Sequence, residues 1–300
     1  MEVIRTNQLS KAFPSTLAVD KVSLHVNAGE IYGFVGLNGA GKTTTIRMLL
    51  GMIRPTHGSA YVFGHEVGHQ LNVWKDVGYL VEIPCSYPNL TVYENLLIYY
   101  RLRDLPGNKC IDEVMDNLKL TRYRDTKGKH LSTGNQQRLG LAKALIHKPK
   151  LLLLDEPING LDPSGIVEIR DMLKGLSHEG ITIFLSSHIL SEVSKLADKI
   201  GIIHDGKLIK EHTHTELEEQ LKRKLIIDTQ DNHRAIQILI NNGVNTAENP
   251  DGHIETYNEK AVTAPEKISE LLVNNQLPPK RIYLFEEDLE HYFLRLIQGE

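Results

Sequence analysis

The sequence predicts an α/β fold with a parallel sheet at its core, followed by a small α+β region. Three observations lead to this prediction. A short apolar run at 31–35 passes through a glycine-rich stretch into a helical pattern at 44–50. Two more apolar runs, at 151–154 and 181–185, have the continuous hydrophobicity of strands that are buried on both faces of a parallel sheet. From about residue 225 onward, short strand and helix patterns alternate without a run of this kind.

The composition is that of an ordinary globular chain. The 300 residues are 41% hydrophobic and carry a formal net charge of −4, so no basic field points to nucleic acid. The two cysteines, Cys85 and Cys110, have neither disulfide nor metal-ligand spacing, which fits a reducing compartment. No apolar run approaches ~18 residues, and the first residues lack the apolar core of a signal peptide. We therefore expect neither a transmembrane helix nor a signal peptide. If the protein acts at a membrane, we expect it to bind a partner that spans the bilayer.

The glycine-rich stretch is the first candidate site. It fits the phosphate-binding pattern G-x-x-x-x-G-K-[ST] and consists of Gly36, Leu37, Asn38, Gly39, Ala40, Gly41, Lys42, Thr43 and Thr44. Glycines let backbone N–H groups turn around a polyphosphate, and the helix start adds its positive dipole end. Lys42 can then reach the outer phosphates, and the Thr43 hydroxyl can bind Mg²⁺. This pattern occurs by chance in about one chain in a hundred. The strand–loop–helix context makes a chance match less probable still.

Two segments before this loop, 2–8 and 21–27, alternate apolar and polar residues as half-buried strands do. Between them, Phe13 precedes Pro14 in a stretch that is predicted to be a loop. The sequence supports two interpretations of this aromatic ring equally: it packs in the core, or it offers a flat face on which a purine ring stacks.

The chain after the loop changes from strands to helices. Short strands are predicted at 58–65 and 77–81. A capping box of Thr91 and Glu94 then opens a helix, and most of the range 92–147 carries helical patterns. We therefore expect a helical block inserted into the α/β core.

A second candidate site lies at the start of the last helix in this block. Ser132 can cap the helix, and the Ser-x-Gly turn that ends at Gly134 can present backbone N–H groups to an anion. An ordinary structural N-cap is the alternative, and this pattern alone does not separate the two.

Two adjacent acids, Asp155 and Glu156, follow the run of four leucines at 151–154. Ligands of parallel sheets bind at the carboxyl ends of strands. Because adjacent side chains point different ways, one carboxylate can complete a Mg²⁺ site while the other faces a water. The alternative, two solvated loop acids, is less favoured because the phosphate loop lies upstream.

The next segments add a helix, a strand and a hairpin. Asp162 and Pro163 are the N-cap and first residue of a predicted helix. The strand at 181–185 leads to His188; a lone histidine is more often structural, but its place at a strand end favours a role in the site. A hairpin is predicted around Asp205 and Gly206.

The sequence predicts that the C-terminal part is a separate region. A polar, charged, helix-prone stretch at about 212–224 has the character of a linker. Beyond it, strands are predicted at 225–229, 245–248, 253–257 and 281–285, with helices at 232–241, 264–275 and after 286. This is a small α+β domain, and the sequence shows no catalytic constellation in it.

Taken together, these motifs resemble those of the ATP-binding subunits of ABC transporters over about residues 2–222. The family's motifs occur in the family's order: the aromatic A-loop at Phe13, Walker A at 36–44, the Q-loop at Glu82, the signature at 131–138 (LSTGNQQR), Walker B at 151–157 (LLLLDEP), the D-loop at 159–162 and the switch histidine at His188.

The resemblance implies the ABC ATPase fold of P-loop NTPases: a mixed-sheet core, an antiparallel β subdomain and a helical subdomain at about 84–147. It implies an ATP-binding domain at 1–222 and an accessory or regulatory domain at 223–300. It also implies that the chain binds ATP and Mg²⁺ and hydrolyses ATP. The implied catalytic residues are Lys42, Glu156 and His188; the implied metal ligands are Thr43, Asp155 and Glu82; the implied nucleotide contacts are Phe13, residues 36–44, Ser132, Gly134 and Asp162.

The family also implies partners. Two subunits face head to tail, and each ATP lies between Walker A of one and the signature of the other. We expect a homodimer, an integral membrane permease, no nucleic acid, and a cytoplasmic location at the inner face of the membrane. The stretch VEIPCSYPNLTVYENL and the final EEDLEHYFLRLIQGE resemble the bacitracin- and lantibiotic-exporting subgroup, so the expected cargo is a peptide antibiotic; a lipid or another substrate is the alternative.

Three positions depart from the family pattern: Thr133 replaces a signature glycine, Asn135 replaces the signature glutamine, and Glu82 replaces the Q-loop glutamine. Two other function classes compete. A soluble ABC ATPase acting on DNA or ribosomes usually carries coiled-coil arms, basic tracts or two cassettes, which this sequence lacks. A sensor that binds nucleotide without hydrolysis is disfavoured by the intact Lys42 and Glu156.

Overall fold

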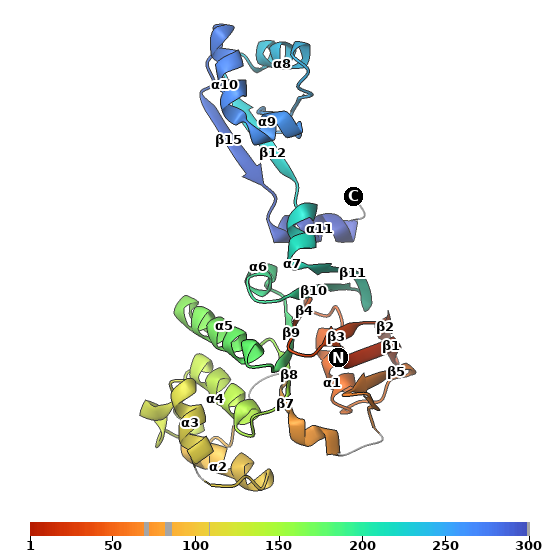
Figure 1. Ribbon diagram of the computed structural model, residues 1–300, viewed down its shortest axis with the longest axis vertical. Coiled ribbons are helices and arrows are strands. Elements are labelled where there is room, and N and C mark those ends of the chain that lie inside the picture. The colour runs from red at the N-terminus through yellow and green to blue at the C-terminus, as the bar shows by residue number, and fades with distance from the viewer. Residues whose placement is uncertain (69–71, 82–85, 108, 299–300) are drawn as a thin grey trace. The chain divides into compact units, whose positions relative to one another are not determined.

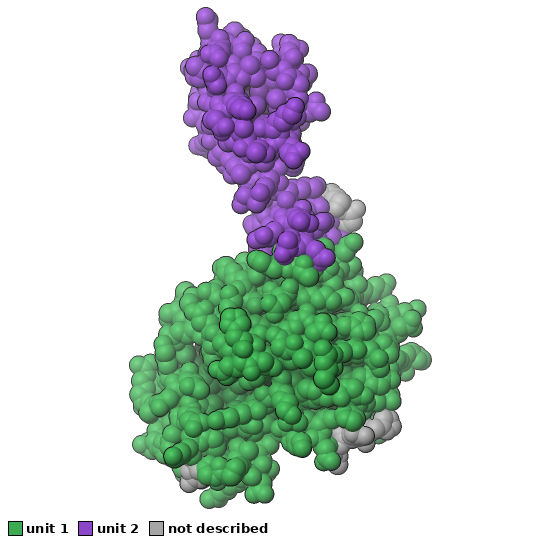
Figure 2. Space-filling view, in the orientation of Figure 1, with its two compact units in different colours: residues 1–214 green, residues 215–300 purple. Residues whose placement is uncertain are grey.

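A computed structural model describes residues 1–68, 72–81, 86–107 and 109–298. The chain divides into two compact units, Met1–His214 and Thr215–Glu300 (Figure 2). The division falls within the stretch that the sequence predicted to be a linker, at the start of helix α7 (His214–Gln220). Within the described ranges, no helix has both the length and the hydropathy needed to cross a bilayer.

The first unit is built around a six-stranded mixed sheet with the order β11-β10-β4-β9-β8-β7 (Figure 1). Its strands are β4 (Ile31–Val35), β7 (Val77–Leu80), β8 (Leu151–Asp155), β9 (Thr182–Ser187), β10 (Lys199–His204) and β11 (Lys207–Thr213). All neighbours are parallel except β11, which returns antiparallel through the predicted hairpin. Every residue of β4, β8 and β9 is buried, which explains their continuous apolar runs.

A second, antiparallel sheet belongs to the same unit. It contains β1 (Glu2–Phe13), β2 (Thr16–Val22), β3 (His25–Asn27), β5 (His57–Val62) and β6 (His65–Glu66). Ile4 of this sheet shares one hydrophobic core with Ile46 of helix α1 (Lys42–Leu49) and with Phe184 of β9. This shared core fixes α1 between the two sheets, and α1 begins at the phosphate-loop lysine.

Two expectations for the N-terminal strands were wrong. The predicted loop before Pro14 is strand up to Phe13, because β1 and β2 form a tight hairpin in which Phe13 pairs with Thr16. The strand predicted at 21–27 is two strands. The chain turns between them, where the Thr6 hydroxyl accepts a hydrogen bond from Leu24 N at 3.0 Å.

The helices of the first unit follow the predicted order. After α1 they are α2 (Val92–Leu102), α3 (Lys109–Asn117), α4 (Thr133–Leu145), α5 (Pro163–His178) and α6 (Leu190–Ser194), with short 3₁₀ turns at Asn72–Asp76, Thr121–Tyr123 and Gly128–His130. The Thr91–Glu94 capping box is present, and Ser132 and Asp162 cap α4 and α5 as predicted. Because these caps fix where α4 and α5 begin, they also fix the loops in front of both helices.

The second unit is the predicted α+β domain. Its antiparallel sheet has the order β13-β14-β12-β15. Its elements are β12 (Arg223–Asp228), α8 (Asn232–Asn241), β13 (Ala247–Glu248), β14 (Ile254–Thr256), α9 (Glu259–Thr263), α10 (Pro265–Asn274), β15 (Arg281–Glu286) and α11 (Leu289–Gln298). The succession strand–helix–strand–strand–helix–strand is the split βαβ arrangement. Its own core joins Leu225 and Ile227 of β12 to Leu239 of α8 and Leu272 of α10.

Candidate functional site

The loop between β4 and α1 has the backbone form that a phosphate cradle needs. A Cβ on Gly36 would lie 2.3 Å from the carbonyl oxygen of Ile203, and Gly41 has φ +106°, so neither position admits a side chain. Gly41 is also the N-cap of α1, and no side chain within the described chain caps that helix. The first N–H groups of α1 are therefore left for an anion.

Lys42 begins α1 and its ammonium is held inside the loop. Its Nζ donates to the carbonyl oxygens of Gly36 at 2.8 Å and Leu37 at 3.1 Å, and it lies 3.5 Å from Glu156 Oε1. Only 6% of the lysine is exposed. A cation so confined marks the position where the outer phosphates of a nucleotide would be neutralised.

Asp155, at the end of β8, lies between two hydroxyl groups. Thr43 Oγ1 donates to its Oδ2 at 2.7 Å, and Ser186 Oγ of β9 donates to its Oδ1 at 2.5 Å. The carboxylate is buried, so these two hydrogen bonds compensate its lost hydration. A hydroxyl and a carboxylate oxygen side by side are the hard oxygen donors that Mg²⁺ prefers, so the pair fits a magnesium site completed by phosphate and water.

Glu156 follows Asp155 in an unusual backbone conformation, with φ +50°. Its N–H donates to the carbonyl and to the hydroxyl of Ser186, at 3.2 and 3.1 Å, and its carbonyl accepts from Gln137 Nε2 at 3.0 Å. The side chain then places Oε1 beside Lys42 and Oε2 2.8 Å from His188 Nδ1. The structure thus joins Lys42, Thr43, Asp155, Glu156 and His188 into one hydrogen-bonded and ion-paired cluster.

Three other predicted contacts gather at a different place. Ser132, Gly134 and Asp162 line a cavity of about 550 Å³ together with Gly160 and Arg138. The cavity lies where the loops before α4 and α5 meet: a Cβ on Gly160 would come within 2.8 Å of the Thr133 methyl group. The Ser164 hydroxyl donates to Asp162 at 2.8 Å and lowers the pKa of that carboxyl, so Asp162 stays ionised. Ser132, Asp162 and Ser164 are exposed to solvent here.

Among the described residues, the predicted contact Phe13 stands apart from both clusters. Phe13 is 44% exposed at the end of β1, and the ammonium of Lys11 lies 5.3 Å from its ring centre. The ring is therefore accessible to solvent, as purine stacking requires. Glu82 lies outside the described residues.

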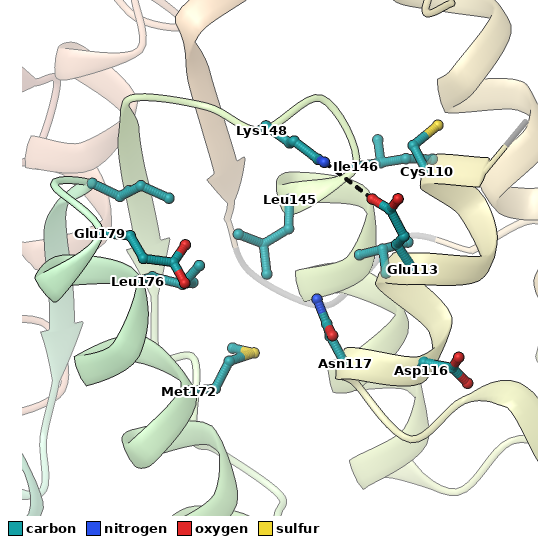
Figure 3. Close-up of a pocket in the computed structure, with 12 residues that line it drawn as sticks. Cys110, Glu113, Asp116, Asn117, Leu145, Ile146, Lys148, Met172, Leu176 and Glu179 are labelled. Atoms are coloured by element: carbon teal, nitrogen blue, oxygen red, sulfur yellow. Dashed lines mark ion pairs between the residues drawn. The ribbon is translucent and has the colours of Figure 1, made fainter. Parts of the chain in front are cut away.

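A further cavity of about 530 Å³ lies between α3, the end of α4 and α5 (Figure 3). Leu145, Met172 and Leu176 form apolar walls, and Lys148 pairs with Glu113 at 3.0 Å at its edge. None of the predicted site residues that the structure describes lines it. It is therefore distinct from the cluster around Lys42 and from the cavity at Ser132.

Comparisons with known proteins agree with this geometry. The family pattern described as ABC transporter matches residues 19–159. The bacitracin transport ATP-binding protein BcrA of Bacillus licheniformis is 41% identical, with 99% of this chain and 98% of that protein covered. The chain belongs to the ABC transporter ATP-binding family. It is the ATP-binding subunit of an ABC transporter, and it is an ATPase.

Other members of the family are also similar. The lantibiotic transport ATP-binding protein SrtF of Streptococcus pyogenes is 36% identical, with 75% of this chain and 99% of that protein covered. A solved ATP-binding subunit of an ABC transporter is 26% identical with a TM-score of 0.66, covering 73% of this chain and 92% of that one. The predicted ABC ATPase fold is thereby confirmed.

Sequence reasoning missed two residues of this ABC ATPase site, Ser186 and Gln137. Ser186 is a hydroxyl within a fully buried strand, which was a usable signal because such a group must find a partner. Gln137 is only 5% exposed. Its place in the first turns of an otherwise ordinary helix gave no comparable signal.

Proposed function

We propose that this ABC ATPase powers the export of a peptide antibiotic, such as bacitracin or a lantibiotic, through a separate membrane permease. The observation that carries the cargo class is the similarity to BcrA along nearly the whole of both chains, including the second unit. The SrtF relative, which is described as a lantibiotic transporter subunit, supports the same class.

The mechanism we propose is attack of water on the γ-phosphoryl group of ATP. The glycine loop and α1 N–H groups hold the phosphates, and Lys42 neutralises their charge. Glu156 polarises the attacking water, and His188 holds the Glu156 carboxylate and the γ-phosphate in line. Bound Mg²⁺, held by Thr43 and Asp155, would supply charge neutralisation at the phosphates. Most of the rate enhancement then comes from positioning and fixed charge.

Nucleotide contacts from a second copy are part of the proposal. Ser132, Gly134 and Asp162 line their own cavity, and none of the five residues of the catalytic cluster lines it. A head-to-tail homodimer brings the cavity of one copy onto the phosphates held by the other. A cassette of the same fold, 23% identical with a TM-score of 0.66, has been solved as a dimer with ADP and Pi.

The remaining assignments follow from this arrangement. The permease anchors the subunit at the cytoplasmic face of the membrane, and we assign its contact to the region around 82–95. Phe13 stacks on the adenine ring, and Glu82 contributes to the metal site. The region after residue 222 is assigned an accessory or regulatory role.

The test uses a bacitracin-sensitive cell that expresses this chain with the permease encoded beside it. We expect a raised inhibitory concentration of bacitracin or of a lantibiotic, and no rise with Glu156→Gln. Unchanged tolerance to both peptides, in cells whose purified complex hydrolyses ATP, would contradict the cargo while leaving the ATPase intact.

A further inference from the structure

The Glu156 backbone is held from both sides by residues of different elements. Its N–H donates to Ser186 in β9, and its carbonyl accepts from Gln137 in α4 and from Asn159 N at 3.1 Å. A left-handed conformation costs a non-glycine residue roughly 1–2 kcal/mol. These contacts offset that cost and fix where the carboxylate points.

Gln137 differs from the other two partners because of where it comes from. Ser186 lies in the central sheet and Asn159 lies three residues from Glu156, so both belong to the catalytic strand region. Gln137 belongs to α4, four residues after Thr133, which is about 6 Å along the helix. Ser132 caps the start of the same helix, and Gly134 lies in its first turn. Both residues are assigned to the second nucleotide.

The first turns of α4 also contact the loop after Glu156. The Thr133 methyl lies against Gly160, and a Cβ built on Gly134 would lie 3.4 Å from Leu161. Because α4 packs on this loop and reaches the Glu156 carbonyl, a shift of its start changes the hydrogen bond that fixes the carboxylate.

We propose that Gln137 is a positioning residue that makes the placement of Glu156 depend on α4, and so couples the two nucleotide sites of a dimer. Nucleotide bound at the α4 start of one copy orients the Glu156 of that same copy, which acts on the other nucleotide. The inference rests on the proposed head-to-tail arrangement. It adds a route through Gln137 by which one site senses the other.

The test compares steady-state ATP hydrolysis by the full chain and by two variants. Gln137→Met keeps the side-chain volume but removes the donor. Gln137→Glu keeps the shape and places an oxygen against the Glu156 carbonyl. The matched control is Ser177→Ala, which removes another side-chain donor to a backbone carbonyl, the 2.7 Å bond to Gly29, away from the site.

We expect kcat to fall about 2- to 10-fold in Gln137→Met and further in Gln137→Glu, since one hydrogen bond is lost and then replaced by repulsion. KM, the affinity for ADP and the melting temperature stay close to wild type. The Hill coefficient for ATP, above 1 in the wild type, falls toward 1. Ser177→Ala keeps both the rate and the coefficient.

Two results would overturn the inference: a kcat in both variants equal to that of the wild type, or a Hill coefficient that is the same in all proteins. A different result would contradict the proposed site itself: the Lys42→Ala variant would then hydrolyse ATP at the wild-type rate. A wild type that hydrolyses ATP through Lys42 while both Gln137 variants match it contradicts only the inference.

Discussion

The two candidate sites of the first unit are built in opposite ways. In the first cluster Lys42 and Asp155 are buried, Glu156 is half-buried, and these charged groups are partnered within the chain. The cavity at Ser132 and Asp162 is lined by loops that open to solvent. In the mechanism that we propose, the first is a preorganised reaction centre, and the second receives a nucleotide that is held by another copy. We call the first cluster the closed half of the proposed site and the cavity its open half.

The largest expected effect tests the closed half. Glu156→Gln keeps the shape of the side chain and removes the base, and a general base typically contributes about 10²–10⁴-fold in rate. We expect turnover to fall by this factor while ATP still binds. Turnover by the purified full chain and calorimetry with ATP measure the two quantities. Normal turnover in this variant would show that Glu156 is not the base.

The next effect separates binding from chemistry within the same cluster. Lys42→Ala removes the buried ammonium that the loop holds for the phosphates, and charge-assisted hydrogen bonds contribute about 1.5–3 kcal/mol each. We expect the affinity for ATP to fall by about 10²-fold or more, as read by calorimetry. Ser177→Ala serves again as the control. Near-normal affinity would refute the phosphate-loop assignment.

A change in the open half should spare nucleotide affinity. Ser132→Arg fills the cavity with a bulky cation where the second copy is expected to present its phosphates. We expect hydrolysis to fall about tenfold or more, while the affinity of the chain for ADP stays normal. A loss of ADP affinity equal to that of Lys42→Ala would show that the two halves are not separate.

The smallest expected effect is on stability. It concerns His147, which follows α4 and contacts β7 of the central sheet. His147 Nε2 contacts the carbonyl oxygen of Val77 at 3.1 Å, and burial lowers the pKa of His147 to about 4. Because the unfolded chain takes up this proton near pH 6.5, it binds more protons than the folded chain between pH ~4 and ~6.5. Stability is therefore lost as the pH falls through this window.

His147→Gln keeps a donor for Val77 and removes the titration. We expect urea unfolding of this variant to depend less on pH between ~4 and ~6.5 than unfolding of the wild type, with turnover at neutral pH unchanged. An identical pH dependence in the two proteins would argue against this assignment.

How far the sequence predicts the site differs from one residue to another. Walker A, Asp155, Glu156 and His188 could be found because each stands at the end of a buried strand, where apolar runs are easy to read. The buried hydroxyl of Ser186 indicated only that this group needs a partner, and Gln137 gave no signal, because a hydrogen bond across strands or from a helix leaves no periodic trace. Phe13 was placed in a loop because Pro14 suggested a break, yet pairing with Thr16 carries the strand up to the proline.

The central claim is that the closed half of one chain works only against the open half of another. The most direct measurement is size-exclusion chromatography of Glu156→Gln with and without ATP, beside the double variants that add Lys42→Ala or Ser132→Arg. The account predicts an ATP-dependent dimer for Glu156→Gln alone and monomers for both double variants. A dimer that forms without ATP, or one that survives Ser132→Arg, would contradict it.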